Sequence, residues 1–254
     1  MKNILVTGAN GQLGLAIKAA VTDYPQLSFV FAGKAELDVT DAQQIEAFFD
    51  SKPFDFCINA AAYTDVDKAE EEPQAAFLLN ETGPRLLAEA CKKQGVFLIH
   101  ISTDYVFDGT KGSPYTVKDT PNPINVYGAS KLAGEQAIAA IGADYCIVRT
   151  SWLYSEFGKN FQTKILEKAK TKSYLKVVSD LYGTPTYAPN LVVFLFNIFK
   201  QRQFSQNIVH FSDGKIMSWY ALAKKIAGNK GVVKRKDLRD IKLKALRPIN
   251  TSII

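Results

Sequence analysis

The sequence predicts an α/β fold, a doubly wound parallel sheet followed by a smaller C-terminal lobe. Over the first 150 residues, short apolar runs alternate with segments whose apolar residues recur at helical spacing. One of these runs, Phe97–Ile101, is almost continuously apolar, as strands buried on both faces are. Strands joined by helical crossovers form a parallel sheet with helices on both faces, so this rhythm predicts the architecture.

Each element of this first part follows from its own pattern. Runs of four to seven apolar and β-branched residues predict strands, and apolar residues three and four positions apart predict the helices between them. The expected strands are Asn3–Thr7, Ser28–Ala32, Phe54–Asn59, Val96–Ser102 and Tyr145–Arg149. The expected helices are Leu13–Val21, Ala42–Ser51, Pro73–Gln94 and Val126–Ile141.

After Thr150 the alternation is less regular. We interpret residues 151–254 mainly as a smaller lobe over the C-terminal edge of the sheet, where open α/β sheets bind ligands. A segment near 176–202 is expected to return to the first domain, residues 1–150. The elements expected here are helices near Asn160–Lys170, Pro189–Phe199 and Ser218–Ala227, and strands near Leu175–Val178 and Ile208–Phe211.

Composition excludes several classes of protein. The chain has 254 residues, 47% hydrophobic and 22% charged, which is typical of a globular protein with a sizeable core. Its three cysteines and two histidines have no metal-ligand spacing, so neither a disulfide scaffold nor a metal site is expected. The most apolar stretch, Leu191–Phe199, is too short to span a bilayer, and the N-terminus lacks a signal pattern. We expect a cytoplasmic protein with no membrane partner.

The net charge of +6 is concentrated at one end of the chain. Residues 224–254 contain ten basic residues against two acidic ones, Asp237 and Asp240, so the rest of the chain is slightly acidic. A solvated surface is one interpretation of this segment. A phosphate-bearing small ligand or an anionic polymer is the other.

A glycine-rich turn, Gly8-Ala9-Asn10-Gly11-Gln12-Leu13-Gly14, separates the first expected strand from the first helix. Glycines at such a turn let the backbone approach a pyrophosphate, and the helix N-terminus offers unpaired N–H groups. Its GxxGxxG spacing differs from GxGxxG, but its place at the first strand–helix junction favours a dinucleotide site over a purely structural turn. Residues 1–150 are therefore expected to form a Rossmann-like dinucleotide-binding domain.

The end of the second expected strand bears on the choice of cofactor. An acidic residue there would bind the 2′-hydroxyl of the adenosine ribose and disfavour a 2′-phosphate. The strand instead runs into Gly33-Lys34, with acids only at Glu36 and Asp38. The absence of an acidic residue at the end of this strand predicts NADPH in preference to NADH. NADH is the alternative, because a lysine that points into solvent would give the same pattern.

A possible catalytic group lies on the expected helix 126–141. Tyr127 and Lys131 are four residues apart and so share a face of that helix. We expect the nearby ammonium to lower the pKa of the phenol from its ordinary value of about 10, making Tyr127 a general acid/base. Thr103, at the end of a buried strand, is placed to reach a carbonyl oxygen held beside Tyr127. His100 and the cysteines are interpreted as buried packing residues.

With these motifs the sequence resembles the extended short-chain dehydrogenase/reductase superfamily and, within it, the dTDP-4-dehydrorhamnose reductases. The match covers nearly the whole chain. Its motifs are Thr7–Gly14, Asn59–Thr64, Val66–Glu70, Ser102–Gly109, Tyr127-Gly128 with Lys131–Glu135, Arg149–Tyr154 and Arg247-Pro248.

The resemblance implies reduction of the C4 ketone of dTDP-4-dehydro-L-rhamnose to dTDP-L-rhamnose, with hydride from the nicotinamide and a proton from Tyr127. Thr103 would hydrogen-bond the reacting oxygen, and Lys131 would touch the nicotinamide ribose, as would Tyr127. The implied cofactor-binding residues also include Gly8, Gly11, Gln12, Leu13, Gly14, Asp38, Val39, Ala62, Tyr63 and Thr64. The implied substrate-binding residues are Thr103, Asp104 and Trp152, to which we add Arg247 as a contact for the diphosphate.

Two alternatives stay open. Dehydratases of the superfamily carry an Asp-Glu pair where this chain has Asp104-Tyr105, so simple ketone reduction is favoured over dehydration. Another nucleotide-sugar reductase or an epimerase of the same superfamily is the first alternative. A non-catalytic regulatory subunit, similar to the β subunit of methionine adenosyltransferase, would bind NADP without turnover.

Further expectations concern assembly. The metal-binding glutamates of some relatives correspond to Ala16 and Pro189, so no metal is expected. We expect a monomer or homodimer that binds no nucleic acid. The chain is also short for the family after Arg247.

Overall fold

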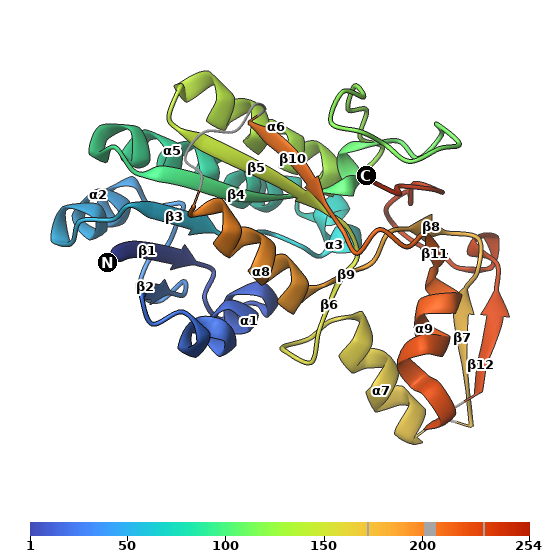
Figure 1. Ribbon diagram of the computed structural model, residues 1–254. Coiled ribbons are helices and arrows are strands. Elements are labelled where there is room, and N and C mark those ends of the chain that lie inside the picture. Colours follow the sequence, from blue (N-terminus) through green and yellow to red (C-terminus); the bar gives the residue numbers. More distant parts are fainter. Residues whose placement is uncertain (172, 201–206, 231) are drawn as a thin grey trace.

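The computed structural model describes residues 1–171, 173–200, 207–230 and 232–254. Its largest feature is a six-stranded sheet in the order β10-β5-β4-β3-β1-β2, and every neighbouring pair is parallel (Figure 1). The prediction of a parallel α/β sheet is therefore confirmed. The strands are β1 (Lys2–Thr7), β2 (Leu27–Ala32), β3 (Phe56–Asn59), β4 (Phe97–Thr103), β5 (Tyr145–Thr150) and β10 (Ile208–Phe211).

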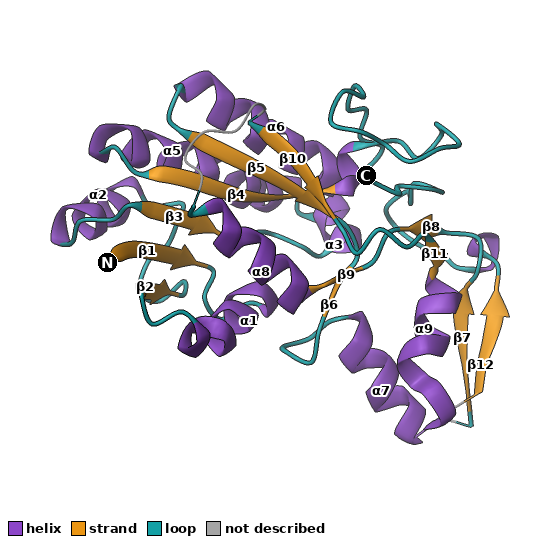
Figure 2. Ribbon diagram, viewed as in Figure 1, coloured by secondary structure: helices purple, strands orange, loops and turns teal. Residues whose placement is uncertain are grey.

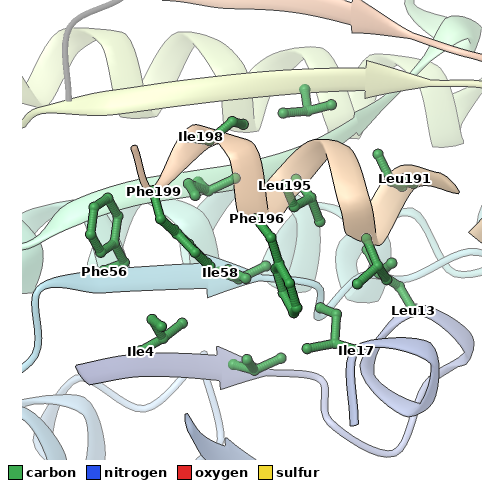
Figure 3. Packing of buried hydrophobic residues seen from close by; sticks show 14 of the residues in the cluster. Ile4, Leu13, Ile17, Phe56, Ile58, Leu191, Leu195, Phe196, Ile198 and Phe199 are labelled. Carbon is green, nitrogen blue, oxygen red and sulfur yellow. The ribbon is translucent and has the colours of Figure 1, made fainter. Parts of the chain in front are cut away.

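Helices cover both faces of this sheet (Figure 2). On one face lie α1 (Gln12–Ala20) and α8 (Ala188–Ile198), which pack against each other and on the strands. Figure 3 shows side chains of α8, such as Leu195 and Phe196, above Ile58 of β3. On the other face lie α2 (Ala42–Ser51), α5 (Gly83–Gln94) and α6 (Val126–Ile141).

The long helix expected over residues 73–94 is interrupted. It consists of α4 (Pro73–Phe77), a π-helical turn η2 (Leu78–Thr82) and α5, and it follows α3 (Val66–Glu71). Pro84, in the first turn of α5, lacks an N–H and cannot donate a hydrogen bond to the preceding turn. The π-helical turn also brings the carbonyl of Asn80 against Gly134 of α6, where a Cβ atom would clash.

A smaller lobe lies beside one end of the sheet (Figure 1). Its core is formed by two helices packed on a parallel pair of strands, β7 and β12, and short strand pairs connect it to the large sheet. The helices are α7 (Phe161–Thr171) and α9 (Trp219–Ala227), and the strands are β6 (Leu153–Tyr154), β7 (Tyr174–Val178), β8 (Tyr182–Gly183), β9 (Thr186–Tyr187), β11 (Met217–Ser218) and β12 (Val232–Lys236). Short 3-10 turns are η1 (Val21–Asp23), η3 (Asp104–Val106), η4 (Gly228–Lys230) and η5 (Leu238–Asp240).

The chain crosses between the two parts more than once. Within the segment 176–202, α8 packs on the large sheet, whereas the end of β7 belongs to the smaller lobe; positions 201 and 202 lie outside the described residues. The strand Ile208–Phe211 was expected in the smaller lobe, and that expectation was wrong. It pairs in parallel with β5 and so forms β10, the edge strand of the large sheet.

The order of the sheet locates a binding site. β2 lies on one side of β1, and β3 and the later strands lie on the other side. The direction in which strands are added therefore reverses between β1 and β3. In open α/β sheets this point, at the carboxyl ends of the strands, leaves a crevice for a ligand. The glycine turn after β1 and the motif after β3 both lie there. In the described part of the chain, no helix is both long and apolar enough to cross a membrane.

Candidate active site

The glycine turn after β1 has the geometry that the sequence predicted. Gly8 has a φ of +64°, and a Cβ atom there would lie 2.5 Å from the backbone nitrogen of Ala61. Gly14, in the first turn of α1, packs on the backbone of Ala9, where a Cβ would approach to 2.6 Å. Gly11 precedes α1, so the turn presents the N-terminus of a helix to the crevice. A phosphate can approach this backbone closely because no side chain stands in the way.

Two neighbouring cavities open at this turn and share a wall formed by Asn10, Gly11, Ala60 and Ala62. Each encloses about 500 Å³, the size expected of small-molecule sites. One extends toward β2 and is lined by Gly8, Lys34, Asp38, Val39 and Tyr63, among others. The other extends toward β4 and α6 and is lined by Gln12, Leu13, Thr64, Thr103, Asp104, Tyr127, Lys131 and Trp152, among others.

Most of the predicted site residues thus meet along one crevice. Gly14 lines neither cavity and acts through packing. The Tyr63 hydroxyl donates to Glu72 at 2.9 Å, while its backbone N–H donates to Asn80. Gln12 donates to Ser155 at 3.1 Å and so ties the glycine turn to the segment that leads into α7.

The helix that carries Tyr127 and Lys131 begins at a well-defined cap. Asn125 is the N-cap of α6, and its side chain accepts a hydrogen bond from the Gly128 N–H at 2.7 Å. The Val126 N–H donates to Glu70 at 2.8 Å. With two donors of the first turn satisfied, the helix starts at a fixed residue, and Tyr127 and Lys131 both face the cavity one turn apart.

The expected effect of Lys131 on the Tyr127 phenol was wrong. Burial raises the pKa of Tyr127 to about 12, with a small opposing effect of the Thr103 hydroxyl and a further rise from the Asp104 charge. The Nζ atom of Lys131 is directed toward β4, where it donates to the Ile101 carbonyl at 2.7 Å and contacts His100. Burial lowers the pKa of Lys131 to about 8, against a smaller effect of Glu135. Tyr127 is accordingly a protonated acid at neutral pH.

Thr103 and Asp104 lie at the end of β4 beside Tyr127. The Thr103 hydroxyl accepts from the Tyr105 N–H and donates to Asp104 Oδ1 at 3.1 Å. Asp104 is buried, and its other carboxyl oxygen accepts from Thr251, a residue near the C-terminal end. Burial raises the pKa of Asp104 to about 7, although the hydrogen bonds to Thr251 and Thr103 oppose the shift. This carboxyl group can therefore hold a proton near neutral pH.

The raised pKa of Asp104 predicts a pH-dependent stability. Between the ordinary carboxyl pKa of 3.8 and the raised pKa of about 7, Asp104 keeps a proton in the folded chain that it has lost in the unfolded chain. The stability that this group contributes is therefore fully present below about pH 4, and it declines as the pH rises to about 7. We expect the melting temperature of wild type, relative to Asp104→Asn, to fall over this range and to stay constant above it. Melting curves of both proteins at several pH values check this, and a constant difference would contradict it.

The indole of Trp152, an implied substrate-binding residue, stacks on Trp219 of α9, with ring centroids 3.8 Å apart. Trp152 has a φ of +46°, the only positive value among the described non-glycine residues. Gly183 packs on its ring, where a Cβ atom would lie 2.6 Å from the indole. Trp152 still lines the cavity beside Tyr127, so it can contact a ligand there, but only by a surface that Trp219 leaves open.

Arg247 is not free to act as a single diphosphate contact in this structure. Its guanidinium donates to the Asp67 carboxylate at 2.8 Å, and Asp67 also accepts from the backbone N–H groups of Lys244 and Ala245. Partial burial alone would raise the pKa of Asp67. The backbone donors and the Arg247 charge outweigh this effect and hold that pKa below its ordinary value. The C-terminal segment is thereby fastened to α3.

A third cavity of about 900 Å³ lies in the smaller lobe and was not anticipated. Phe161, Lys164, Ile165 and Lys168 of α7 line it from one helical face, since they are three and four residues apart. That spacing is visible in the sequence and could have revealed this wall. The remaining walls come from β7, Trp219, Arg247 and Tyr105, and Tyr105 also lines the cavity beside Tyr127. The basic side chains here are Lys164, Lys168, Lys176 and Arg247, so only Arg247 comes from the basic segment 224–254.

The shape of the site fits a dinucleotide. The glycine turn provides the cradle that a pyrophosphate needs, and the crevice extends from it in two directions. Over the described ranges, no three His, Cys, Asp or Glu side chains are grouped to hold a metal. The described cysteines are buried and unpaired.

The sequence model of one protein family, described as the RmlD substrate binding domain, matches residues 1–253. The chain belongs to this family. A curated relative of the RmlD family, a dTDP-4-dehydrorhamnose reductase from Sinorhizobium fredii (strain NBRC 101917 / NGR234), is 42% identical over 226 residues, 87% of this chain and 76% of the relative. Another from Aggregatibacter actinomycetemcomitans is 35% identical over 266 residues, 100% of this chain and 90% of the relative. A dTDP-4-keto-6-deoxy-D-glucose reductase from Streptomyces niveus is 36% identical over 221 residues, 87% of this chain and 76% of the relative.

Solved structures similar to this RmlD-family chain include a dTDP-4-dehydrorhamnose reductase from Bacillus anthracis str. Ames in complex with NADP. The two share 36% sequence identity with a TM-score of 0.95, over 100% of this chain and 91% of the other. A dTDP-4-dehydrorhamnose reductase from Clostridium acetobutylicum ATCC 824, described as an RfbD ortholog, has a TM-score of 0.94 at 36% identity, over 99% of this chain and 90% of the other.

Proposed function

We propose that this chain reduces the C4 ketone of dTDP-4-dehydro-L-rhamnose to dTDP-L-rhamnose with NADPH. The observation that carries this proposal is that Tyr127, Lys131 and Thr103 line one cavity that begins at the glycine turn. The relatives named dTDP-4-dehydrorhamnose reductase, and the similar structure in complex with NADP, support both the reaction and the cofactor.

In this proposal, the bound cofactor supplies hydride to the carbonyl carbon. Gly11, Gln12 and Leu13 would hold the pyrophosphate at the start of α1, where backbone N–H groups and the helix dipole favour negative charge. Asp38 and Val39 would border the adenine end, and Ala62, Tyr63 and Thr64 would form the wall behind the cofactor.

Tyr127 would donate the proton to the developing alkoxide. Its raised pKa keeps the phenol protonated at neutral pH, and an alkoxide is a stronger base than a phenolate. Thr103 would turn its hydroxyl from Asp104 toward the same oxygen and stabilise the charge that develops there. The direction of proton transfer therefore suits reduction.

The sugar nucleotide would extend from Tyr127 into the cavity of the smaller lobe. Tyr105 borders both spaces, so a ligand can pass from one to the other along this side chain. The lobe cavity combines aromatic rings, Phe161 and Trp219, with lysines at Lys164 and Lys168. Aromatic faces suit a pyrimidine base, and lysines suit a diphosphate.

We expect Lys164→Ala with Lys168→Ala to raise KM for the sugar nucleotide about tenfold, which corresponds to about 1.4 kcal/mol, with kcat little changed.

The preference for NADPH can be tested at Lys34. Its side chain is 87% exposed at the rim of the cavity and only 3.7 Å from Asp38, a contact that a 2′-phosphate can replace. We expect Lys34→Ala to raise KM for NADPH about threefold to tenfold, as loss of an exposed charge pair does, and to leave KM for NADH unchanged. Steady-state kinetics with both cofactors provide the measurement. An equal change for both would show that Lys34 does not contact the phosphate.

Addition of the keto-sugar nucleotide to the enzyme and NADPH tests the function itself. We expect oxidation of NADPH with dTDP-4-dehydro-L-rhamnose and slower oxidation with dTDP-4-keto-6-deoxy-D-glucose, the substrate in the name of the Streptomyces niveus relative. The reverse order would move the assignment to that second reaction. Binding of NADPH without turnover of either would support the regulatory-subunit alternative.

The remaining expectations about the protein's surroundings are part of the same proposal. The protein would act in the cytoplasm as a monomer or homodimer. Its partner would be the nucleotide-sugar substrate, and it would bind neither nucleic acid nor a membrane.

A further inference from the structure

Trp152 has a backbone conformation that few bulky residues adopt. Its φ of +46° lies in the left-handed region, where a side chain other than that of glycine is strained. The residue lies between β5 and β6, where the chain leaves the large sheet for the lobe. Such strain persists only where neighbouring contacts hold it, and it is often found at a ligand site. The contacts that hold Trp152 therefore bear on its function.

The backbone around Trp152 is fixed by a segment that lies beside it. Thr150 Oγ1 donates to Thr186 Oγ1 at 3.0 Å, and the Ser151 hydroxyl donates to the Thr184 carbonyl. The Thr186 N–H donates to the Trp152 carbonyl at 3.4 Å. The four hydroxyl-bearing residues are buried, so these bonds are shielded from water. They hold the left-handed turn of the main chain, whereas the indole is held by other groups.

Two groups hold the indole of Trp152. Trp219 stacks on it, with ring centroids 3.8 Å apart and ring planes 9° from parallel. Gly183 lies so close that a Cβ atom there would be 2.6 Å from the indole. The short antiparallel pair β8–β11 aligns these two groups, because Met217 is opposite Gly183 and Trp219 follows β11 directly. The indole is therefore oriented by residues that are distant from it in the sequence.

Trp219 is itself fixed in place. It is the first residue of α9, and the N-cap of this helix, Ser218, accepts a backbone hydrogen bond. The Trp219 N–H donates to the Leu181 carbonyl at 3.3 Å. Its ring contacts Phe161 of α7, with centroids 4.4 Å apart. Trp219 can thus serve as a platform for the indole of Trp152.

The stacked pair lies where the two cavities meet. Trp152 lines the cavity beside Tyr127, Trp219 lines the cavity of the lobe, and Tyr105 lines both. A ligand that extends from Tyr127 into the lobe therefore passes the indole of Trp152. Aromatic side chains offer large apolar faces, which suit the C–H groups of a sugar ring. The orientation of this indole thus affects how a sugar would bind.

We propose that Trp219 is a positioning residue, which holds the Trp152 indole in the orientation that receives the sugar of the substrate. The proposal rests on the proposed function, because it takes a nucleotide sugar as the ligand of both cavities. Trp219 belongs to the lobe, so the wall beside the sugar is complete only when the lobe packs on the sheet as in this structure. Affinity for the sugar nucleotide, rather than the rate of the chemical step, should then depend on the stack.

The stack can be observed in the protein without ligand. The chain has two tryptophans, so tryptophan-selective NMR gives one set of ring signals for each, and Trp219→Phe assigns them. We expect ring currents to shift the Trp152 ring protons upfield in wild type and in Trp219→Phe, and this shift to disappear in Trp219→Leu. Trp152 signals at ordinary positions in the wild type would overturn the proposal. The spectrum depends on neither turnover nor ligand binding, so it is separate from a failure of the proposed function.

Two substitutions displace the indole of Trp152 by different routes. Trp219→Leu removes the ring on which it stacks. Gly183→Ala places a methyl group against the indole but leaves Trp219 intact, and Gly183 lines neither cavity. Trp219→Phe, which keeps an aromatic face, is the conservative replacement. Tyr220→Leu is the control, because it removes the next aromatic ring of α9, which faces Arg235 and lines neither cavity.

We measure the dissociation constant of the product, dTDP-L-rhamnose, by calorimetry with NADP present, together with KM and kcat. We expect Trp219→Leu and Gly183→Ala each to weaken binding and to raise KM for the sugar nucleotide about tenfold. The values of kcat and of KM for NADPH should stay within about threefold of wild type. Trp219→Phe and Tyr220→Leu should bind the product much as wild type does. Because both substitutions disturb one indole, the double variant should bind little more weakly than either single variant.

Unchanged affinity in Gly183→Ala, beside weakened affinity in Trp219→Leu, would show that Trp219 acts by its own contact in the lobe cavity and would overturn the proposal. Equal losses of affinity for NADPH and for the sugar nucleotide would show only a loosened fold and would overturn it as well. Absence of dTDP-L-rhamnose binding to wild type would refute the proposed function, and with it the role of the stack, although the NMR signals would still show the stack itself. If one variant does not fold, the wild-type spectrum and the other variant still decide.

Discussion

Tyr127→Phe is expected to lower kcat by a factor of about 10² to 10⁴, the range associated with loss of a general acid. The phenol is the proton donor in the proposed reaction, and phenylalanine keeps the ring that packs against Tyr105, with centroids 5.8 Å apart. Cofactor affinity should change little, because only the hydroxyl is removed. Steady-state turnover and a fluorescence titration with NADPH provide the two measurements.

Tyr145→Phe is the matched control for this variant. Tyr145 begins β5, at the opposite end of the sheet from the crevice, so loss of its hydroxyl should leave kcat unchanged. If Tyr127→Phe retained kcat within about threefold, Tyr127 would not be the acid.

Glu135→Ala is expected to lower the free energy of unfolding by about 3–5 kcal/mol, as breaking a buried ion pair does. The Arg149 guanidinium donates to both Glu135 oxygens, and each side chain is only 3% exposed. Ser102 also bonds Glu135. Removal of Glu135 would leave Arg149 charged in the core, above the ring of Phe107 at 5.3 Å. Urea unfolding monitored by circular dichroism measures the loss.

Glu46→Ala tests the same chemistry at the surface. Glu46 pairs with Lys93 at 2.5 Å, but both side chains are more than half exposed, so solvent screens the pair. We expect no resolvable change in the free energy of unfolding of Glu46→Ala. Equal losses in the two variants would contradict the assigned role of burial.

The strands and helices of the sheet were predictable because local patterns determine them. The runs that became β1 to β5 are largely apolar, and α6 has the bounds that its apolar spacing predicted. Val126–Ile141 has the expected bounds because Asn125 caps one end and Gly142, with a φ of +66°, ends the other. The π-helical turn before Pro84 was not expected, because its hydrogen bonding depends on the packing of Asn80 against Gly134.

Contacts between distant segments were not predictable in the same way. Arg247 pairs with Asp67 across 180 positions, and Trp152 stacks on Trp219. The partners Asp67 and Trp219 have no local signature, so Trp152 was assigned to a ligand from the family resemblance and Arg247 from its place in the basic segment. Likewise, the pattern of Ile208–Phe211 indicated a strand but could not indicate its neighbour, β5.

His100 illustrates the limit most clearly for the site. An apolar strand with one histidine is typical of a buried packing residue, and His100 is indeed fully buried. Its contact with Lys131 arises because β4 passes beneath α6, which only the tertiary structure shows. The residue types of the candidate site were predictable from motifs, whereas the hydrogen-bond partners of Lys131 were not.

Transfer of hydrogen from cofactor to sugar tests the central claim most directly. The enzyme is incubated with dTDP-4-dehydro-L-rhamnose and NADPH that carries deuterium at both C4 positions of the nicotinamide, and the sugar nucleotide is analysed by mass spectrometry and NMR. We expect dTDP-L-rhamnose with one deuterium, at C4 of the sugar, and almost none with Tyr127→Phe. Tight binding of NADPH with no deuterium in the sugar would contradict the account.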